Sequence, residues 1–143
     1  MPEQSITQLP STVGSSESLA RYLTQSNHIR RLDQTVSPRA FDPPHDLRLS
    51  VYRTDGLSTE KVWEIGQVHV VERMTPPRNL YGMGSIKASA VRAVHLDVEP
   101  EEGPPRHACI FGWPDGPEGK PERMSLAQEL AATATLVLRT SAG

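Results

Sequence analysis

The chain has 143 residues, of which 36% are hydrophobic and 22% are charged, and its formal net charge is -2. A chain of this length fits one ordinary domain with extended ends. The small net charge excludes strong non-specific attraction to nucleic acid or to acidic membranes. With Cys109 as its one cysteine, the chain cannot form an intramolecular disulfide.

The N-terminal residues, MPEQSITQLPSTVG, lack the basic and apolar regions of a secretory signal. No apolar run approaches the roughly 20 residues that a membrane-spanning helix needs. We therefore expect a cytoplasmic protein without a membrane partner. Residues 1–17 are poor in large apolar side chains, so we expect them to form a flexible tail, and residues 140–143 to form a disordered end.

Residues 18–46 are expected to form a short helix followed by a proline-rich loop. Leu19, Tyr22 and Leu23 follow the i, i+3, i+4 spacing of a helix face, which predicts a helix over residues 16–31. Three prolines in the segment SPRAFDPPHD then predict a loop, with Phe41 as its anchor in the core. The folded domain is predicted to span residues 47–139.

The first half of that domain reads as a strand and a helix. Leu47, Leu49 and Val51 alternate with polar residues, as in a strand with one buried face. Ser58 is placed to cap a helix over residues 59–72. Gly66 lies in the middle of this helix, where glycine often marks close packing against another backbone.

The second half is expected to contain a loop, two helices and two strands. Residues 74–84 are predicted as loop, residues 86–94 as a helix capped by Ser85, and residues 96–99 as a strand. The apolar segment 107–113 is predicted to be the central strand, covered on both faces, and residues 121–138 the last helix. The order predicts an α+β fold in which a three-stranded or slightly larger sheet is packed by two to three helices.

His107 and Cys109 are the strongest candidates for chemistry, because residues two apart on a strand share a face. They could form a base and thiolate pair, with Arg106 as an anion clamp, or contribute two metal ligands. No spacing provides a third partner, so we favour a structural role. His69, His95 and His107 form no ligand signature, and we expect neither a metal nor a cofactor.

Two weaker patterns point to anion binding. The segment YGMGSI places glycines before a predicted helix start, although an ordinary turn explains it better. Arg48 and Tyr52 share one face of the first strand, whereas alternation places Arg53 on the other face and Arg106 lies beside the predicted central strand. A solvated strand face is the simpler interpretation.

Trp113, before Pro114, can anchor a binding surface or plug the end of the core.

The leading hypothesis is a non-enzymatic binding or accessory module that acts through a partner protein. Its expected contact groups are Leu19, Tyr22 and Leu23 on the first helix and Trp113 near the glycine-rich loop. The segments LSVYRTDGLSTEKVWEIG and PRHACIFGWPD have the character of a compact bacterial domain, but they carry no motif that transfers an activity.

Two other classes remain open at this point. One is a small hydrolase or group-transfer enzyme that acts on a nucleotide or peptide through Cys109, His107 and Arg106. The other is a nucleic-acid binder, and its candidate residues are His28, Arg30, Arg31 and Arg39. The net charge makes nucleic acid the weakest of the three partners. The oligomeric state is left open.

Overall fold

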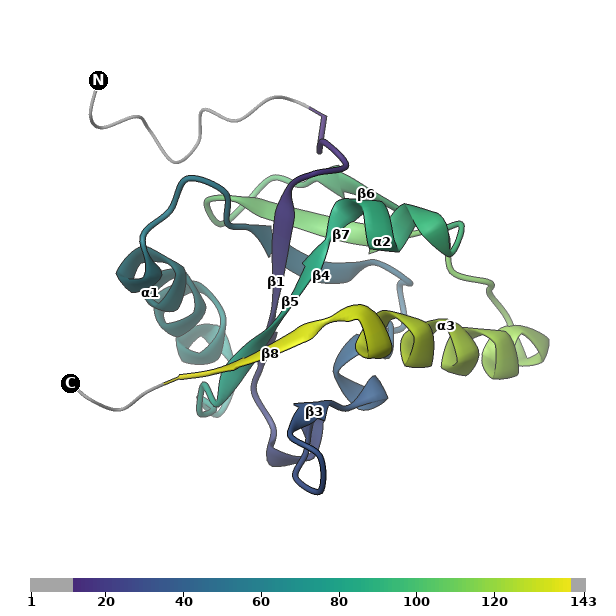
Figure 1. Cartoon of the computed structure of the whole chain (residues 1–143), viewed down its shortest axis with the longest axis horizontal. Coiled ribbons are helices and arrows are strands. Elements are labelled where there is room, and N and C mark those ends of the chain that lie inside the picture. The colour runs from purple at the N-terminus through teal and green to yellow at the C-terminus, as the bar shows by residue number, and fades with distance from the viewer. Residues whose placement is uncertain (1–11, 140–143) are drawn as a thin grey trace.

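The computed structural model describes residues 12–139, which form an α+β fold around an antiparallel sheet (Figure 1). Among these residues, six strands lie in the order β6-β7-β4-β1-β5-β8, and every neighbouring pair is antiparallel. Their bounds are β1 (Ser18–Leu23), β4 (Leu49–Arg53), β5 (Gly82–Lys87), β6 (Asp97–Pro100), β7 (His107–Phe111) and β8 (Thr135–Leu138). The expected α+β class is confirmed, with a larger sheet than three strands.

The remaining elements are short. The helices are α1 (Thr59–His69), α2 (Ala88–Ala93) and α3 (Lys120–Thr133). A separate hairpin pairs β2 (Ile29–Arg30) with β3 (Thr35–Val36). Within the described part of the chain, four 3₁₀ helices connect the rest: η1 (Ser26–His28), η2 (Pro38–Phe41), η3 (Val71–Arg73) and η4 (Pro117–Gly119). Within residues 12–139, no helix has the length and apolar content to cross a bilayer.

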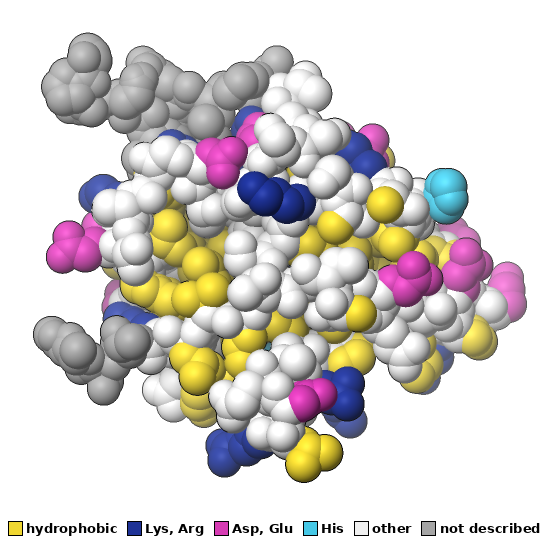
Figure 2. All heavy atoms as spheres, in the orientation of Figure 1, with side chains coloured by type: hydrophobic (Ala, Val, Ile, Leu, Met, Phe, Trp, Pro, Cys, Tyr) yellow, Lys and Arg dark blue, Asp and Glu magenta, His cyan; other side chains and the backbone are white. Residues whose placement is uncertain are grey.

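One side of the sheet packs against α2, α3 and η2. Its core contains Leu19 and Leu23 of β1, Ile110 of β7 and Leu130 of α3, all without solvent exposure. Phe41 is also fully buried there, so its predicted role as a loop anchor is confirmed. In Figure 2, hydrophobic side chains form a band over β8 and the flanking helices, and most charged side chains surround it.

Helix α1 covers the other side of the sheet, over Tyr22 and Tyr52. Ser58 caps it as predicted, since its hydroxyl accepts a hydrogen bond from the Lys61 amide at 3.2 Å. Gly66 faces the sheet so closely that a Cβ there would lie 2.7 Å from the Tyr22 ring. Gly66 thus allows the close approach of a side chain rather than of another backbone, and the Tyr22 hydroxyl donates to the carbonyl oxygen of Val62 at 2.6 Å.

The prediction of a helix over residues 16–31 is wrong, because residues Ser18–Leu23 form strand β1. Leu19 and Leu23 face one core while Tyr22 faces the other. A strand buried on both faces has no polar alternation, and its apolar residues then fall on helical spacing by chance. Since β1 lies between β4 and β5, the folded unit also begins well before residue 47.

Residues 12–17 belong to this folded unit and correct the prediction of a flexible tail over residues 1–17. Val13 is 1% exposed, and Glu17 forms a bidentate ion pair with Arg53 of β4, with N···O distances of 2.8 and 2.7 Å. The predicted ends at residues 1–11 and 140–143 lie outside the described residues.

Three further features differ from the sequence-based prediction. The segment around YGMGSI is strand β5 rather than a loop and a helix start, and helix α2 begins only at Ala88. Helix α3 ends at Thr133, and the chain continues as the edge strand β8. Segment 107–113 contains β7, which is second from the sheet edge and not central.

Candidate functional site

His107 and Cys109 lie on the same face of β7, as expected, but they do not form a catalytic pair. His107 Nε2 is 3.0 Å from Ser50 Oγ, and His107 Nδ1 is 3.2 Å from the carbonyl oxygen of Glu102. Because a carbonyl only accepts, Nδ1 carries the proton of the neutral ring, and Nε2 accepts from the Ser50 hydroxyl. The partner of His107 is thus a serine that the sequence analysis did not single out.

Cys109 is unsuited to nucleophilic chemistry. It has no solvent exposure, and burial, reinforced by the Glu101 carboxylate, raises the pKa of its thiol to about 12. The thiolate is the reactive form of cysteine, so a thiol that stays protonated at neutral pH is inert. The structure therefore supports the structural role that we favoured for Cys109.

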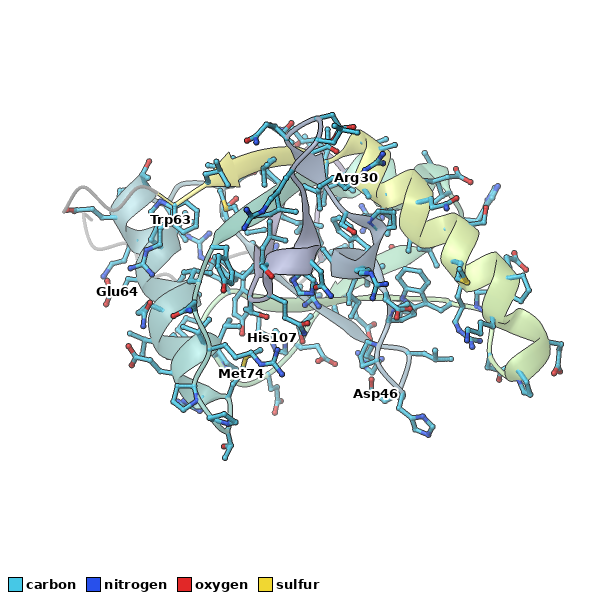
Figure 3. The ribbon with its side chains drawn as sticks, turned by 90° about the horizontal axis from the view of Figure 1, so that it is seen from below. Arg30, Asp46, Trp63, Glu64, Met74 and His107 are labelled. Carbon is cyan, nitrogen blue, oxygen red and sulfur yellow. The ribbon has the colours of Figure 1, made fainter. Side chains whose placement is uncertain are left out.

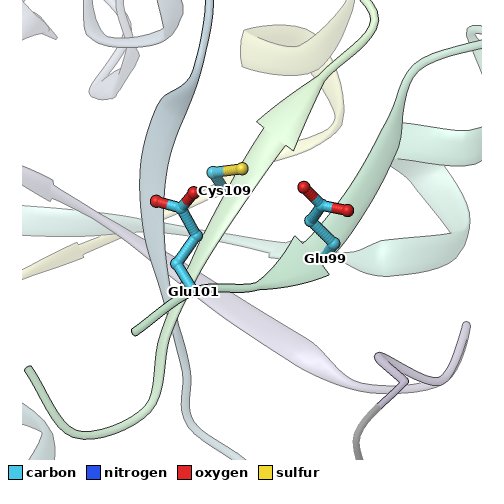
Figure 4. Close-up of side chains that lie close together, drawn as sticks. All are labelled: Glu99, Glu101 and Cys109. Atoms are coloured by element: carbon cyan, nitrogen blue, oxygen red, sulfur yellow. The ribbon is translucent and has the colours of Figure 1, made fainter. Parts of the chain in front are cut away.

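Cys109 lies close to the carboxylates of Glu99 on β6 and of Glu101 directly after it (Figure 4). The ligand atoms of Glu99, Glu101 and Cys109 all lie within 4.8 Å of one another, which is close enough for a metal site. However, Arg48 Nη2 already forms ion pairs with both carboxylates. A metal ion would have to displace this guanidinium, so the cluster is best described as an ion-pair network. The three histidines considered above form no such group within residues 12–139.

The arginines considered for an anion-binding surface have separate partners. Arg106, the expected clamp, donates to the carbonyl oxygen of Asp55 at 2.7 Å. Arg53 pairs with Glu17, and Arg48 pairs with Glu99 and Glu101. These contacts neutralise the charges of Arg48 and Arg53 and fix loops against the sheet.

The expected contact groups of a protein partner all lie in the core. Leu19, Tyr22, Leu23 and Trp113 are at most 5% exposed. Trp113 Nε1 donates to the carbonyl oxygen of Ile110 at 3.1 Å, so this side chain plugs the end of the core. None of the four offers surface to a partner.

The candidate nucleic-acid residues do not form a continuous basic surface. His28 is 7% exposed, whereas Arg30 is at the hairpin, where its nearest carboxylate is Asp33 at 3.8 Å. Arg31 is in the turn of the hairpin, and Arg39 is on η2 beside α3.

A groove lies between the proline-rich loop and the start of α3. It has a volume of about 820 Å³ and is open to solvent along one side. Figure 3 shows α3 and the loop that carries Asp46 on the same side of the molecule. The lining consists of prolines and apolar side chains flanked by basic residues: Pro38, Arg39, Asp42, Pro43, Pro44, His45, Leu47, Gly116, Pro117, Lys120, Arg123, Met124, Ala127 and Gln128.

The walls of this groove are fixed by internal contacts. Ser37 caps η2 by accepting from the Arg39 amide at 3.2 Å, and the Leu47 amide donates to the carbonyl oxygen of Pro44 at 2.8 Å. On the opposite wall, Arg123 donates to the carbonyl oxygens of Pro114 and Gly116 at 2.8 and 2.9 Å. The sequence predicts one wall as a loop and the other as the start of the last helix, but it carries no signal that these two segments face each other.

Comparison with known proteins gives no relative from which a role can be transferred: no family model, no curated protein and no solved structure matches the chain.

Proposed function

We propose that the protein is a non-enzymatic binding module that acts through a partner protein, and that an extended acidic segment of the partner occupies the groove between the proline-rich loop and α3. The observation that carries this proposal is a preformed recess with an apolar floor and a basic rim. In this proposal the groove contacts the partner, in place of the buried residues Leu19, Tyr22, Leu23 and Trp113 that the sequence suggested.

The apolar part of the groove suits a hydrophobic side chain of the partner. Met124 is 54% exposed, although it lies beside Leu47 and the buried Ala127. Methionine adapts its shape to different apolar partners, and large exposed apolar groups beside a concave surface often mark binding sites. The prolines limit the freedom of the walls, which reduces the entropy lost when a ligand binds.

The rim selects the charge of the partner. Arg39, Lys120 and Arg123 line the groove with one carboxylate, Asp42. Lys120 and Arg39 form no ion pair within residues 12–139. Complementary charges at an interface steer the encounter and exclude wrong partners, so an acidic segment is favoured over a basic one.

A peptide-display selection on the purified protein tests this proposal. We expect the selected peptides to combine Asp or Glu with a large apolar residue, and their binding to shift the NMR signals of Lys120 and Met124. The variant Lys120→Glu should lose these peptides. Lys61→Glu makes the same charge change on α1, away from the groove, and should retain them. Selected peptides without acidic residues, or shifts that map elsewhere, would contradict the proposal.

The hydrogen bond between His107 and Ser50 favours a second candidate, a small hydrolase or group-transfer enzyme. In such an enzyme, Ser50 Oγ would attack a carbonyl or phosphoryl centre while its proton passes to His107 Nε2. The bond to the leaving group would break as His107 returns that proton to it, and water or an acceptor group would then release the acyl or phosphoryl group from Ser50. This version uses Ser50 in place of Cys109. Hydrolysis of an activated ester by the wild type, with equal loss in Ser50→Ala and His107→Gln, would support it, and rates equal to the uncatalysed reaction would exclude it for such esters.

A further inference from the structure

Strand β8 is one edge of the sheet, and its outer side carries backbone groups that point away from the fold. The Arg139 amide donates to the carbonyl oxygen of Tyr81 at 3.1 Å, directly beyond the pair of Leu138 with Gly82. Along an antiparallel ladder, residues that direct both backbone groups at the neighbouring strand alternate with residues that direct both away. Because Arg139 is of the first kind, Leu136 and Leu138 direct their N–H and C=O groups away from β5.

The described part of the chain leaves this edge open. Within residues 12–139, β8 has β5 as its one neighbour in the sheet, and no hydrogen bond reaches the outward groups of Leu136 and Leu138. Figure 1 shows β8 in front of the other strands with no element drawn before it, and in Figure 3 the same strand lies along the rim of the ribbon. The described elements therefore leave the outer side of β8 accessible to another strand.

The opposite edge of the sheet, strand β6, is closed by its own residues. Its ladder with β7 leaves Val98 and Pro100 as the outward residues. The Val98 amide donates to Asp97 Oδ1 at 2.8 Å, and the Val98 carbonyl oxygen accepts from Arg92 Nη2 at 3.4 Å. Pro100 has no N–H to donate. Proline and charged side chains are the usual means by which proteins prevent a further strand from adding to a sheet.

Strand β8 has none of these devices. Its four residues, Thr135–Leu138, include no proline and no charge. Leu138 is 48% exposed, although a leucine side chain is stabilised by leaving water. Figure 2 looks onto this edge and shows hydrophobic side chains gathered over β8. The strand thus offers free backbone groups together with an apolar side chain.

We propose that two copies of the chain pair their β8 strands antiparallel about a twofold axis at Val137, so that the two sheets become one. In this register Leu136 of each copy faces Leu138 of the other, and every outward N–H and C=O group of these leucines is paired. A shift by two residues would place Ala134 opposite Leu138 instead. The Ala134 amide is already bonded to the carbonyl oxygen of Leu130 at 3.0 Å, so that register satisfies fewer groups.

The side chains and charges of β8 favour a second copy of this chain as the occupant. In the proposed register Val137 faces Val137, and the exposed Leu138 gains Leu136 of the second copy as an apolar neighbour. Arg139 faces Thr135, so no like charges lie opposite each other. Twofold pairing of identical surfaces is the commonest arrangement of homo-oligomers. The groove lies at the first part of α3 and β8 follows its end, so this inference is independent of the proposed function.

Sedimentation equilibrium of the full chain tests the association. An edge of four residues per copy makes a small interface, so we expect a reversible dimer with a dissociation constant of about 100 μM or below. A monomer mass at every concentration up to about 500 μM would overturn the proposal and leave the edge to a strand of another protein.

The variant Val137→Cys locates the pairing. Residues that face each other across such a pair have Cβ atoms about 4.5 to 5.5 Å apart, close to the range of a disulfide. We expect mild oxidation to link two Val137→Cys chains. Glu102→Cys, exposed beyond the opposite edge of the sheet, should stay unlinked, and the buried Cys109 does not compete. Equal linking of both variants, or none at Val137→Cys, would contradict pairing at β8.

A charge exchange at the same position tests the twofold axis. Val137→Lys and Val137→Glu each place like charges opposite each other, so we expect either variant alone to associate at least about tenfold more weakly than the wild type. Circular dichroism verifies that both keep the fold. An equal mixture places lysine opposite glutamate and should restore the dimer. Wild-type association of either folded variant alone, or a mixture of folded variants that stays monomeric, would show that Val137 does not face itself.

Discussion

Replacing Glu17 with glutamine tests whether residues 12–17 are part of the fold. Glu17 accepts two hydrogen bonds from the Arg53 guanidinium and one from the Gly14 amide at 2.9 Å. The side chains of Arg53 and Glu17 are 4% and 12% exposed. Breaking a buried ion pair from one side typically costs about 3 to 5 kcal/mol. Because glutamine keeps the shape and one acceptor, we expect Glu17→Gln to lower the free energy of unfolding by about 3 kcal/mol at pH 7.

Urea unfolding followed by circular dichroism, at pH 7 and at acidic pH, measures this effect. The hydrogen bond from Arg53 holds the pKa of Glu17 below its ordinary value, so the charged form stabilises the folded state. That contribution is complete above the pKa of the unfolded chain and disappears as the pH falls through the lowered folded-state pKa. The difference between variant and wild type should therefore shrink in acid. The exposed pair of Lys61 and Glu64 provides the control, Glu64→Gln, for which we expect less than about 1 kcal/mol. A change below about 0.5 kcal/mol for Glu17→Gln, or a loss independent of pH, would refute the reasoning.

Two further predictions concern packing. Gly66→Ala should lower the free energy of unfolding by about 1 to 3 kcal/mol, although alanine has the better helix propensity. The reason is that the new Cβ would lie 2.7 Å from the Tyr22 ring and 2.9 Å from Leu80. A stabilised variant in the same unfolding assay would show that α1 lies farther from the sheet. Cys109 should resist a thiol reagent in the native protein and react rapidly in denaturant, since its pKa is raised to about 12 by burial. Native modification at the denatured rate would restore the cysteine enzyme hypothesis.

Local signals in the sequence were sufficient to predict an element when that element's own residues determine where it begins and ends. Ser58 marks the start of α1, and its cap forms as the sequence predicts. Phe41 stands out among prolines and is buried. Alternation identified β4, and proline on each side delimited β7. In these cases the side-chain pattern and the local backbone preference agree.

The sequence-based predictions were wrong where tertiary contacts decide whether a segment forms a strand, a helix or a loop. Gly82 and Gly84 suggested a loop, yet they are in β5. A Cβ at Gly82 would lie 2.5 Å from the carbonyl oxygen of Val137, and one at Gly84 would lie 3.2 Å from the Val36 side chain. Their role is close packing, which a single sequence does not distinguish from a turn. Leu138 fitted the helical spacing of α3, but the chain is already extended at Ala134.

The candidate sites were harder to predict than the fold, because each one combines distant segments. The groove joins the loop at Pro43 to α3 at Met124. Ser50 lies beside His107 only because β4 pairs with β7. Residue types alone do not predict which distant side chains come into contact in the folded chain.

The most direct test of the proposed function is the affinity of an acidic, apolar peptide from the display selection for the wild type, Lys120→Glu and Lys61→Glu, measured at low and high salt. We predict that Lys120→Glu binds about tenfold more weakly at low salt, that Lys61→Glu binds like the wild type, and that the difference narrows as salt screens the rim charges. Equal affinity for all three proteins would contradict the assignment of the groove as the partner-binding site.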